Sequence, residues 1–159
     1  MTYYTYIDTP AGTLLLIGDG IVVSGIHWKV FKRAPIVQLE WVEDHSVFAN
    51  VIRQLDAYFA GERRVFNVAF SLHGTAFQEQ VWSELLKIPF GVHSSYQMIA
   101  TSIGRPKAVR AVGTAVGSNP ISIIVPCHRV LTSDNKLGGY AGGLSSKQCL
   151  LEREEVAWR

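Results

Sequence analysis

Cysteine is scarce in this sequence, and long apolar runs are absent. The 159 residues include two cysteines, Cys127 and Cys149, which are too few for a disulfide framework or a four-cysteine zinc site. No apolar stretch approaches the roughly 20 residues that a membrane-spanning helix needs, and the first residues do not resemble a signal peptide. We therefore expect a soluble cytoplasmic protein with free thiols, no metal site and no membrane partner.

Acidic residues are also missing from a long internal segment. Residues 93–133 contain neither Asp nor Glu, yet they carry four cations, Arg105, Lys107, Arg110 and Arg129. The net charge of the chain is only +2, so the distribution of charge is more informative than its sum. A basic surface of this kind permits nucleic-acid binding but does not establish it, because solvated basic faces are common.

The first half of the chain has the pattern of a small sheet with one helix. Residues 2–12, 13–20 and 21–28 are three β-rich runs that are separated by turn signals, including Asp19-Gly20. Apolar residues at helical spacing between Val47 and Glu62 predict a helix, and the alternation over residues 63–74 predicts a further strand.

The second half has the pattern of short helices, so we expect two domains, residues 1–73 and 74–159. An apolar stripe over residues 75–87 predicts a core helix. Ser94 or Ser95 can cap the next helix, and Pro106 suits the first turn of the one after it, which extends to Val116. Two short helices joined by Gly-Arg-Pro are typical of a helix-turn-helix. The predicted fold class is therefore α+β.

The second helix of this pair has an unusual outer face. Its inward seam is made by valines, whereas Arg110, Gly113, Thr114 and Gly117 follow one another at i, i+3, i+4 and i+7. Each interior glycine costs about 1 kcal/mol of helix stability relative to alanine, which predicts close approach of another surface. That surface could be a neighbouring helix or DNA, and the lack of acidic residues nearby favours DNA.

Cys127 is the candidate nucleophile. It follows the apolar run 121–125 and is succeeded by His128 and Arg129, residue types that can give a thiol thiolate character. In an extended segment, neighbouring side chains point to opposite faces, so contact between Cys127 and His128 requires a bend or a water molecule. The residues alone leave open a buried, inert cysteine, which is what we expect for Cys149.

Several ordered motifs in the second half belong together. They are Ile-Pro-Phe-Gly at 88–91 with Ser95-Tyr96, Arg110-Ala111-Val112-Gly113, Asn119-Pro120, Pro-Cys-His-Arg-Val at 126–130, and Gly-Tyr-Ala-Gly-Gly-Leu at 139–144. From residue 75 to 154 the chain closely resembles the O6-alkylguanine-DNA alkyltransferase family, and the first half fits more weakly. The resemblance implies a ribonuclease-H-like first domain and a winged helix-turn-helix-like motif in the second.

The family resemblance also implies a function. It is the single-turnover repair of DNA by irreversible transfer of an alkyl group from O6-alkylguanine, or from O4-alkylthymine, to the protein's own cysteine, with base flipping and without a cofactor. The implied partner is double-stranded DNA, bound through the minor groove with little sequence preference. We expect a monomer in solution, associated with the nucleoid when it is bound to DNA, and leave cooperative binding open.

The resemblance assigns roles to matching positions. Cys127 is the alkyl acceptor, His128 takes its proton through a water molecule, and Glu154 orients His128, although Glu152 or Glu155 could take that place after a shift of register. Asn119 braces the turn before the nucleophile, and Tyr96 helps to rotate the nucleotide and hydrogen-bonds the guanine. Arg110 fills the gap in the base stack. The other expected DNA-binding residues are Ser95, Ala111, Gly113, Thr114 and Ala115, and the guanine pocket is formed by Val130, Tyr140, Ala141 and Tyr96.

Two other functions remain to be weighed. A catalytically silent, alkyltransferase-like protein would bind the lesion and recruit other factors, but such proteins lack the acceptor cysteine that is present here. A cysteine hydrolase could use Cys127 and His128, but it would need an oxyanion hole, for which no separate motif is visible. Multiple turnover on an ester would distinguish the hydrolase from a transferase that reacts once.

Overall fold

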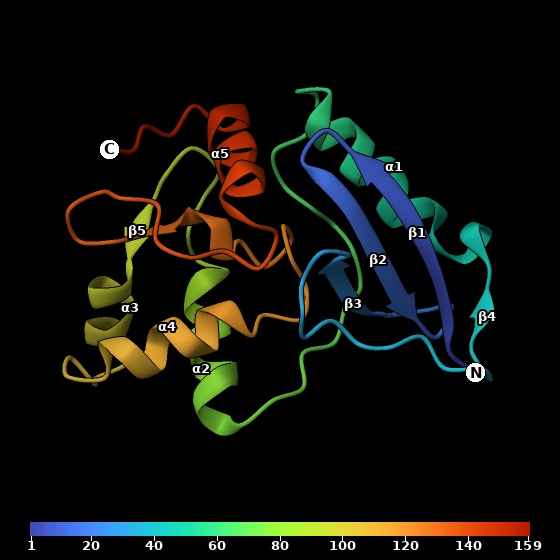
Figure 1. Cartoon of the computed structure of the whole chain (residues 1–159), viewed down its shortest axis with the longest axis horizontal. Helices are drawn as coiled ribbons and strands as arrows, with labels where there is room; N and C mark the ends of the chain where they lie inside the picture. Colours follow the sequence, from blue (N-terminus) through green and yellow to red (C-terminus); the bar gives the residue numbers. More distant parts are fainter.

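The computed structural model describes residues 1–159. Its N-terminal half is a four-stranded sheet with one helix. Strands β1 (Tyr3–Thr9), β2 (Gly12–Gly18) and β3 (Val23–Trp28) are antiparallel, and the short β4 (Val42–Glu43) pairs in parallel with β1. The strand order is β3-β2-β1-β4. Helix α1 (Ala49–Phe59) lies beside this sheet (Figure 1). The three predicted strands and the predicted helix are confirmed.

Local sequence explains these elements. In β1, Thr5 and Ile7 are buried while Tyr6 and Asp8 are exposed, as expected for a strand with one covered face. The turn to β2 places Gly12 at a φ of 138°, a conformation that favours glycine. Helix α1 follows a 3₁₀ turn (His45–Phe48), in which the Asp44 side chain accepts a hydrogen bond from the Ser46 amide.

The strand predicted over residues 63–74 is not formed. This segment makes only a single bridge, between Phe70 and Val23 of β3. The rest of the β3 edge is taken by the second half of the chain, because the Ile26 amide donates to the Pro120 carbonyl and the Ser122 amide donates to the Ile26 carbonyl. A segment 94 or more residues away thus completes the sheet edge, and it leads directly toward Cys127.

The C-terminal half is mainly helical. Helix α2 (Ala76–Leu85) begins at a capping box between Thr75 and Gln78. It is followed by α3 (Tyr96–Ser102), α4 (Val109–Gly117) and α5 (Leu144–Arg153). Two short parallel strands, β5 (Ser94–Ser95) and β6 (Val130–Leu131), join the segment before α3 to the segment after Cys127. No helix of the chain has the length and apolarity needed to cross a membrane.

Helices α3 and α4 form the predicted helix-turn-helix pair. Ser95 is the cap of α3, because its hydroxyl accepts a hydrogen bond from the Met98 amide. Gly104 follows α3 with a φ of 76°. The prediction that the second helix begins at Pro106 is wrong. Residues 105–108 instead form a tight turn in which the Ala108 amide donates to the Arg105 carbonyl, so α4 starts at Val109.

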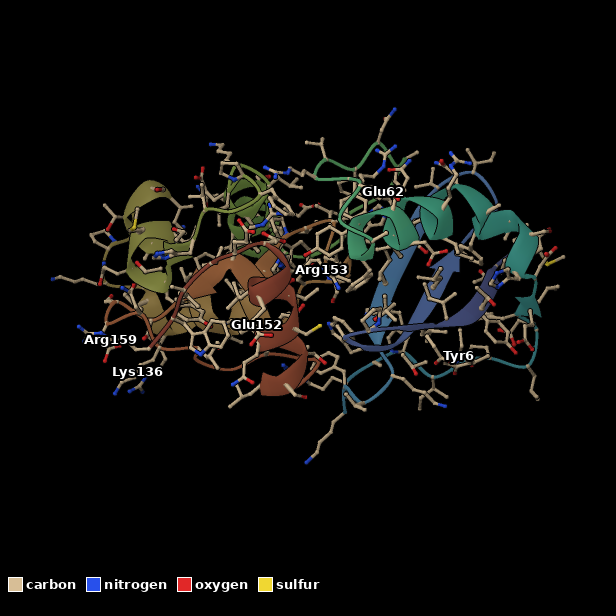
Figure 2. All side chains as sticks on the ribbon, turned by 90° about the horizontal axis from the view of Figure 1, so that it is seen from above. Tyr6, Glu62, Lys136, Glu152, Arg153 and Arg159 are labelled. Atoms are coloured by element: carbon tan, nitrogen blue, oxygen red, sulfur yellow. The ribbon has the colours of Figure 1, made fainter.

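One hydrophobic core extends through both halves, which lie side by side (Figure 2). Trp28 at the end of β3 is almost fully buried, and its indole packs against the segment before α5. A Cβ atom at Gly142 would lie 2.7 Å from the Trp28 ring, so only glycine allows this approach. The indole nitrogen of Trp28 also donates to the Tyr140 hydroxyl at 3.2 Å.

Candidate active site

The loop before Cys127 is held by Asn119. Its side-chain amide nitrogen donates to the Val125 carbonyl at 2.8 Å, and its side-chain oxygen accepts from the Ile121 amide at 2.9 Å. Residues 121–125 are all buried, as predicted, but Ile123 has a φ of 72° and the run forms no regular strand. Asn119 therefore binds both ends of the turn that leads to Cys127.

Cys127 begins a single 3₁₀ turn (Cys127–Arg129). This turn supplies the bend that the sequence required for an approach of His128 to Cys127. Neither ring nitrogen of His128 bonds to the thiol, however, because Nε2 contacts Glu154 and Nδ1 has no hydrogen-bond partner in the protein. A proton would pass between Cys127 and His128 through an intervening molecule or after a small movement.

Glu154 is the acidic residue that contacts His128. Its Oε2 lies 2.7 Å from His128 Nε2 and accepts from the Tyr58 hydroxyl at 2.6 Å. Its Oε1 accepts from Arg129 Nε at 2.7 Å. Glu152 and Glu155 are exposed, and Figure 2 labels Glu152 on α5. Of the three glutamates that the sequence left open, Glu154 is the one that contacts His128, and its role in orienting His128 stays a prediction.

The ionisation of this network follows from its contacts. Burial acts to raise the pKa of Glu154, but the hydrogen bonds and charges of His128 and Arg129 lower that pKa to about 2. Burial lowers the pKa of His128, against the opposing effect of Glu154. A carboxylate can only accept, so Nε2 of the neutral imidazole carries the proton and Nδ1 is left as a free base.

The thiol of Cys127 needs such a base. The side chain is 5% exposed, and burial raises its pKa, with Asn119, Lys147 and Tyr140 acting in the opposite direction. Arg129, which the sequence offered as a second source of thiolate character, instead binds Glu154 and the Ile88 carbonyl. Cys127 is therefore a neutral thiol in the resting protein.

Lys147 is a buried cation that sequence reasoning did not single out. Its ammonium donates to the Val130 carbonyl at 2.7 Å and also to the carbonyls of Leu137 and Gly139. Burial lowers its pKa to about 8. These bonds tie α5 to β6 and to the glycine-containing loop that precedes Tyr140.

A cavity of about 910 Å³ opens beside Cys127. Many of the predicted site residues line it, namely Tyr96, Arg110, Gly113, Thr114, Asn119, Cys127, Tyr140 and Ala141. Val130, which was predicted to line the guanine pocket, is not among the lining residues; its side chain is fully buried and its carbonyl accepts a hydrogen bond from Lys147. His128 and Glu154 are likewise buried outside the lining.

Residues 30–33 of the first half also line the cavity, and the sequence analysis missed them. They follow β3 and include two cations, Lys32 and Arg33. This pair is a weak local signal, since basic pairs are common in loops. Only the packing of the two halves brings the segment to the cavity.

The outer face of α4 is open to solvent. Arg110, Ala111 and Thr114 are exposed, and a Cβ atom added at Gly117 would meet nothing within 4 Å. At Gly113 the added atom would make only an ordinary contact, 3.8 Å from a Tyr96 ring carbon. No neighbouring helix therefore requires these glycines, which removes one of the two explanations that the sequence left open.

Two of the residues predicted to bind DNA are not on the exposed face of α4. Ala115 is only 3% exposed, because it faces the core and its carbonyl accepts a hydrogen bond from the Trp82 indole at 2.8 Å. Its side chain cannot be part of an exposed face, so this prediction is wrong for Ala115. Ser95 is half-buried, and its hydroxyl is engaged in capping α3.

Comparison with known proteins gives a consistent assignment. Residues 76–156 match the family described as 6-O-methylguanine DNA methyltransferase, DNA binding domain, and residues 2–72 match the ribonuclease-like domain of the same proteins. Methylated-DNA–protein-cysteine methyltransferase of Mycobacterium tuberculosis is 47% identical over 98% of this chain and 93% of its own length. The protein of the same name from Methanosarcina barkeri is 44% identical over 96% of this chain and 97% of its own.

A solved structure agrees with the sequence comparison. The crystal structure of a Mycobacterium tuberculosis protein, OGT, in complex with DNA has a TM-score of 0.90 and 46% identity, over 96% of this chain and 92% of that one. Both domains, the fold and nearly the whole length thus agree with the same assignment. The chain therefore belongs to the 6-O-methylguanine DNA methyltransferase family.

Proposed function

We propose that Cys127 is the residue that receives the alkyl group when this protein repairs DNA. As a member of its family, the chain is a methylated-DNA–protein-cysteine methyltransferase and repairs DNA by alkyl transfer. The observation that carries the assignment to Cys127 is its position: its thiol lines the cavity and lies next in sequence to a buried His128 whose Nδ1 is free. Cys149, the only other cysteine, does not line this cavity.

The transfer begins with removal of a proton from the thiol. In this proposal Glu154 holds the Nε2 proton of His128 in a hydrogen bond, which leaves Nδ1 as the base, and Nδ1 takes the thiol proton through one water molecule. The sulfur then attacks the alkyl carbon, a carbon–sulfur bond forms, and the bond between that carbon and guanine O6 breaks. The thioether is stable, so each molecule reacts once.

The departing guanine needs a proton or a hydrogen bond. Tyr96 lines the cavity, and burial raises the pKa of its hydroxyl. The hydroxyl is therefore a donor at neutral pH, and it relieves the negative charge that develops on the base. Tyr140 and Ala141, which line the cavity, enclose the base in this proposal, which extends to O4-alkylthymine as a second substrate.

Reaching the lesion requires extrusion of the nucleotide, at a cost of a few kcal/mol. We infer that α4 enters the minor groove of double-stranded DNA, because its outer face carries small residues and one cation, Arg110, which fills the gap left in the stack. Contacts of this kind carry little sequence preference. We propose a monomer in solution that works in the cytoplasm, on the DNA of the nucleoid, with cooperativity to be measured.

Intact-protein mass spectrometry tests the assignment. The reduced protein is incubated with a duplex that carries one O6-methylguanine, and the adduct is located by peptide mapping. We expect one methyl-sized mass gain on Cys127, saturating at one per protein, in the wild type and in the matched control Cys149→Ala. Cys127→Ala should bind the duplex with unchanged affinity and gain no mass.

Each alternative function predicts a different result, either in this experiment or in an assay of ester hydrolysis. The absence of an adduct on folded, reduced protein would favour a lesion-binding protein without transfer activity. Repeated turnover on an ester by Cys127 would instead favour a cysteine hydrolase. A methyl group on Cys149 alone would contradict the assignment of the acceptor.

A further inference from the structure

The first half of the chain contributes a side chain to the buried network of the second half. Tyr58 lies on α1, and its hydroxyl donates to Glu154 Oε2 at 2.6 Å, although the two residues are 96 positions apart. Tyr58 is 1% exposed. The oxygen that it contacts is the same one that lies 2.7 Å from His128 Nε2. Tyr58 and His128 therefore share one acceptor atom.

The surroundings of Tyr58 make this hydrogen bond strong. Its ring is packed by Phe59, Phe66 and Phe90, at centroid separations of 5.1, 5.6 and 6.2 Å. Hydrogen bonds to a charged group are roughly twice as strong as neutral ones, and a low dielectric strengthens them further. Burial and the charge of Glu154 raise the pKa of Tyr58, so its hydroxyl keeps its proton and remains a donor.

We propose that Tyr58 is a positioning residue of the alkyl transfer, which fixes the Glu154 carboxylate and sets how strongly that carboxylate attracts the Nε2 proton of His128. The proposal rests on the proposed function of His128 as the base. A carboxylate oxygen that accepts from two donors is less basic toward each of them. Removal of the Tyr58 donor should therefore leave His128 less well oriented and easier to protonate.

Other charged groups face this network and remain in place when Tyr58 is changed. Arg129 binds both carboxylate oxygens from the Cys127–Arg129 turn, and the Gly91 amide approaches Oε1 at 3.4 Å. Lys147 of α5 lowers the pKa of His128 through its charge, and Arg153 of α5 acts on Tyr58 in the same way. The carboxylate thus keeps a cationic partner, which favours folding of a variant that lacks the Tyr58 hydroxyl.

The test compares Tyr58→Phe with Tyr3→Phe. Tyr3 is the control, because it is a tyrosine of the first half that packs against the same core but is only partly buried, lies on β1 and makes no side-chain hydrogen bond. The second-order rate of alkylation of Cys127 is measured from pH 5 to pH 9, with an O6-methylguanine duplex and with free O6-benzylguanine. The free base removes any effect on DNA binding.

For Tyr58→Phe we expect a roughly tenfold to hundredfold lower rate on both substrates, because small misplacements of a catalytic group carry costs of this order. We also expect the acidic limb of its pH profile to move to higher pH, whereas Tyr3→Phe matches the wild type. Site-specific 3-fluorotyrosine at position 58 provides a second measurement, since it is a stronger donor of nearly unchanged shape. It should move the acidic limb to lower pH.

Two results would overturn the proposal. One is a pH profile of Tyr58→Phe that superimposes on that of Tyr3→Phe. The other is a loss of rate that is uniform with pH and proportional to a loss of thermal stability, which would make Tyr58 a packing residue. Failure of the proposed function is distinguishable from both, because wild-type Cys127 would then take no alkyl group or His128→Ala would react at the wild-type rate.

Discussion

Glu154 occupies a position in which a lone carboxylate would be strongly destabilising. Desolvation of an ion costs several kcal/mol, so a buried carboxylate must have partners. Arg129, His128 and Tyr58 provide them, and each approaches a carboxylate oxygen to within 2.7 Å. The side chain that binds His128 is therefore also a structural ion, and a change in its protonation should be visible in stability as well as in activity.

We predict that this carboxylate makes stability depend on pH under acidic conditions. The pKa of Glu154 is about 2 in the folded protein, compared with an ordinary value of 4.5. As the pH falls, Glu154 is therefore protonated in the unfolded chain before it is protonated in the folded protein. The stabilisation by Glu154 is present above pH 4.5 and is lost as the pH falls from about 4.5 to about 2. The free energy of unfolding falls by about 3 kcal/mol over that interval.

Urea unfolding at a series of pH values measures this effect. Glu154→Gln is the comparison, because it keeps the shape of the side chain but removes the titrating group. The variant should be less stable at neutral pH and should lose less stability than the wild type between pH 4.5 and 2. Parallel losses in the two proteins over that interval would show that other carboxylates control the acid transition.

At the scale of elements, α4 is built for two different surroundings. Val112, Ala115 and Val116 are buried against the rest of the half, whereas Arg110 and Thr114 face solvent. The two glycines on the outer face have no packing partner that would exclude a larger residue. Their cost in helix stability is thus left without a purely structural reason, which agrees with a surface that another molecule approaches closely.

For this helix we predict that Arg110→Ala slows transfer from duplex DNA much more than transfer from a free alkylated base. Only the duplex requires extrusion of the nucleotide, which Arg110 assists in the proposed mechanism. Single-turnover rates on an O6-methylguanine duplex and on free O6-benzylguanine measure the two effects. Lys107→Ala is a suitable control, since it removes an exposed cation from the neighbouring turn. Equal slowing of both substrates would assign Arg110 to the chemistry instead.

For helices α2 and α3, local sequence patterns are sufficient to predict where the helix begins. The capping box of α2 and the serine cap of α3 are local signals, and both helices begin where those signals stand. The alternation over residues 63–74 is equally local, but no continuous strand edge is available there, because Pro120 and Ser122 pair with Ile26 of β3. Pairing between strands depends on what else competes for the edge, and the period of a single segment carries no information about that competition.

At the scale of the whole molecule, the two halves share their core and their site. Trp28 is buried against the second half, and the Ser146 hydroxyl donates to the Ala11 carbonyl across the same boundary. The end of the second half that lies away from the first half is held by contacts within the second half. Arg159 lies beside Lys136 (Figure 2), and the Arg159 amide donates to the Asn135 carbonyl. The domain boundary between residues 73 and 74 stays a prediction, and the hydrophobic core extends across it.

We predict that the protein unfolds as one cooperative unit. Tryptophan fluorescence and far-ultraviolet circular dichroism should give coincident transitions in urea, because a shared core couples the halves. Trp28→Ala should destabilise the whole molecule by about 3–5 kcal/mol, the usual range for removal of a buried tryptophan. Trp41→Ala, at a partly buried position, should cost less. Two separated transitions in the wild type would contradict a single unit.

The sequence by itself determined β1, β2, β3, α1 and α2, the α+β class, and the family to which the motif around Cys127 belongs. Those features depend on residues that are neighbours along the chain. Only the tertiary structure decided that Glu154 is the partner of His128, that Tyr58 and residues 30–33 belong to the site, and that Ala115 faces the core. These outcomes depend on packing between segments up to about a hundred residues apart, which no local pattern specifies.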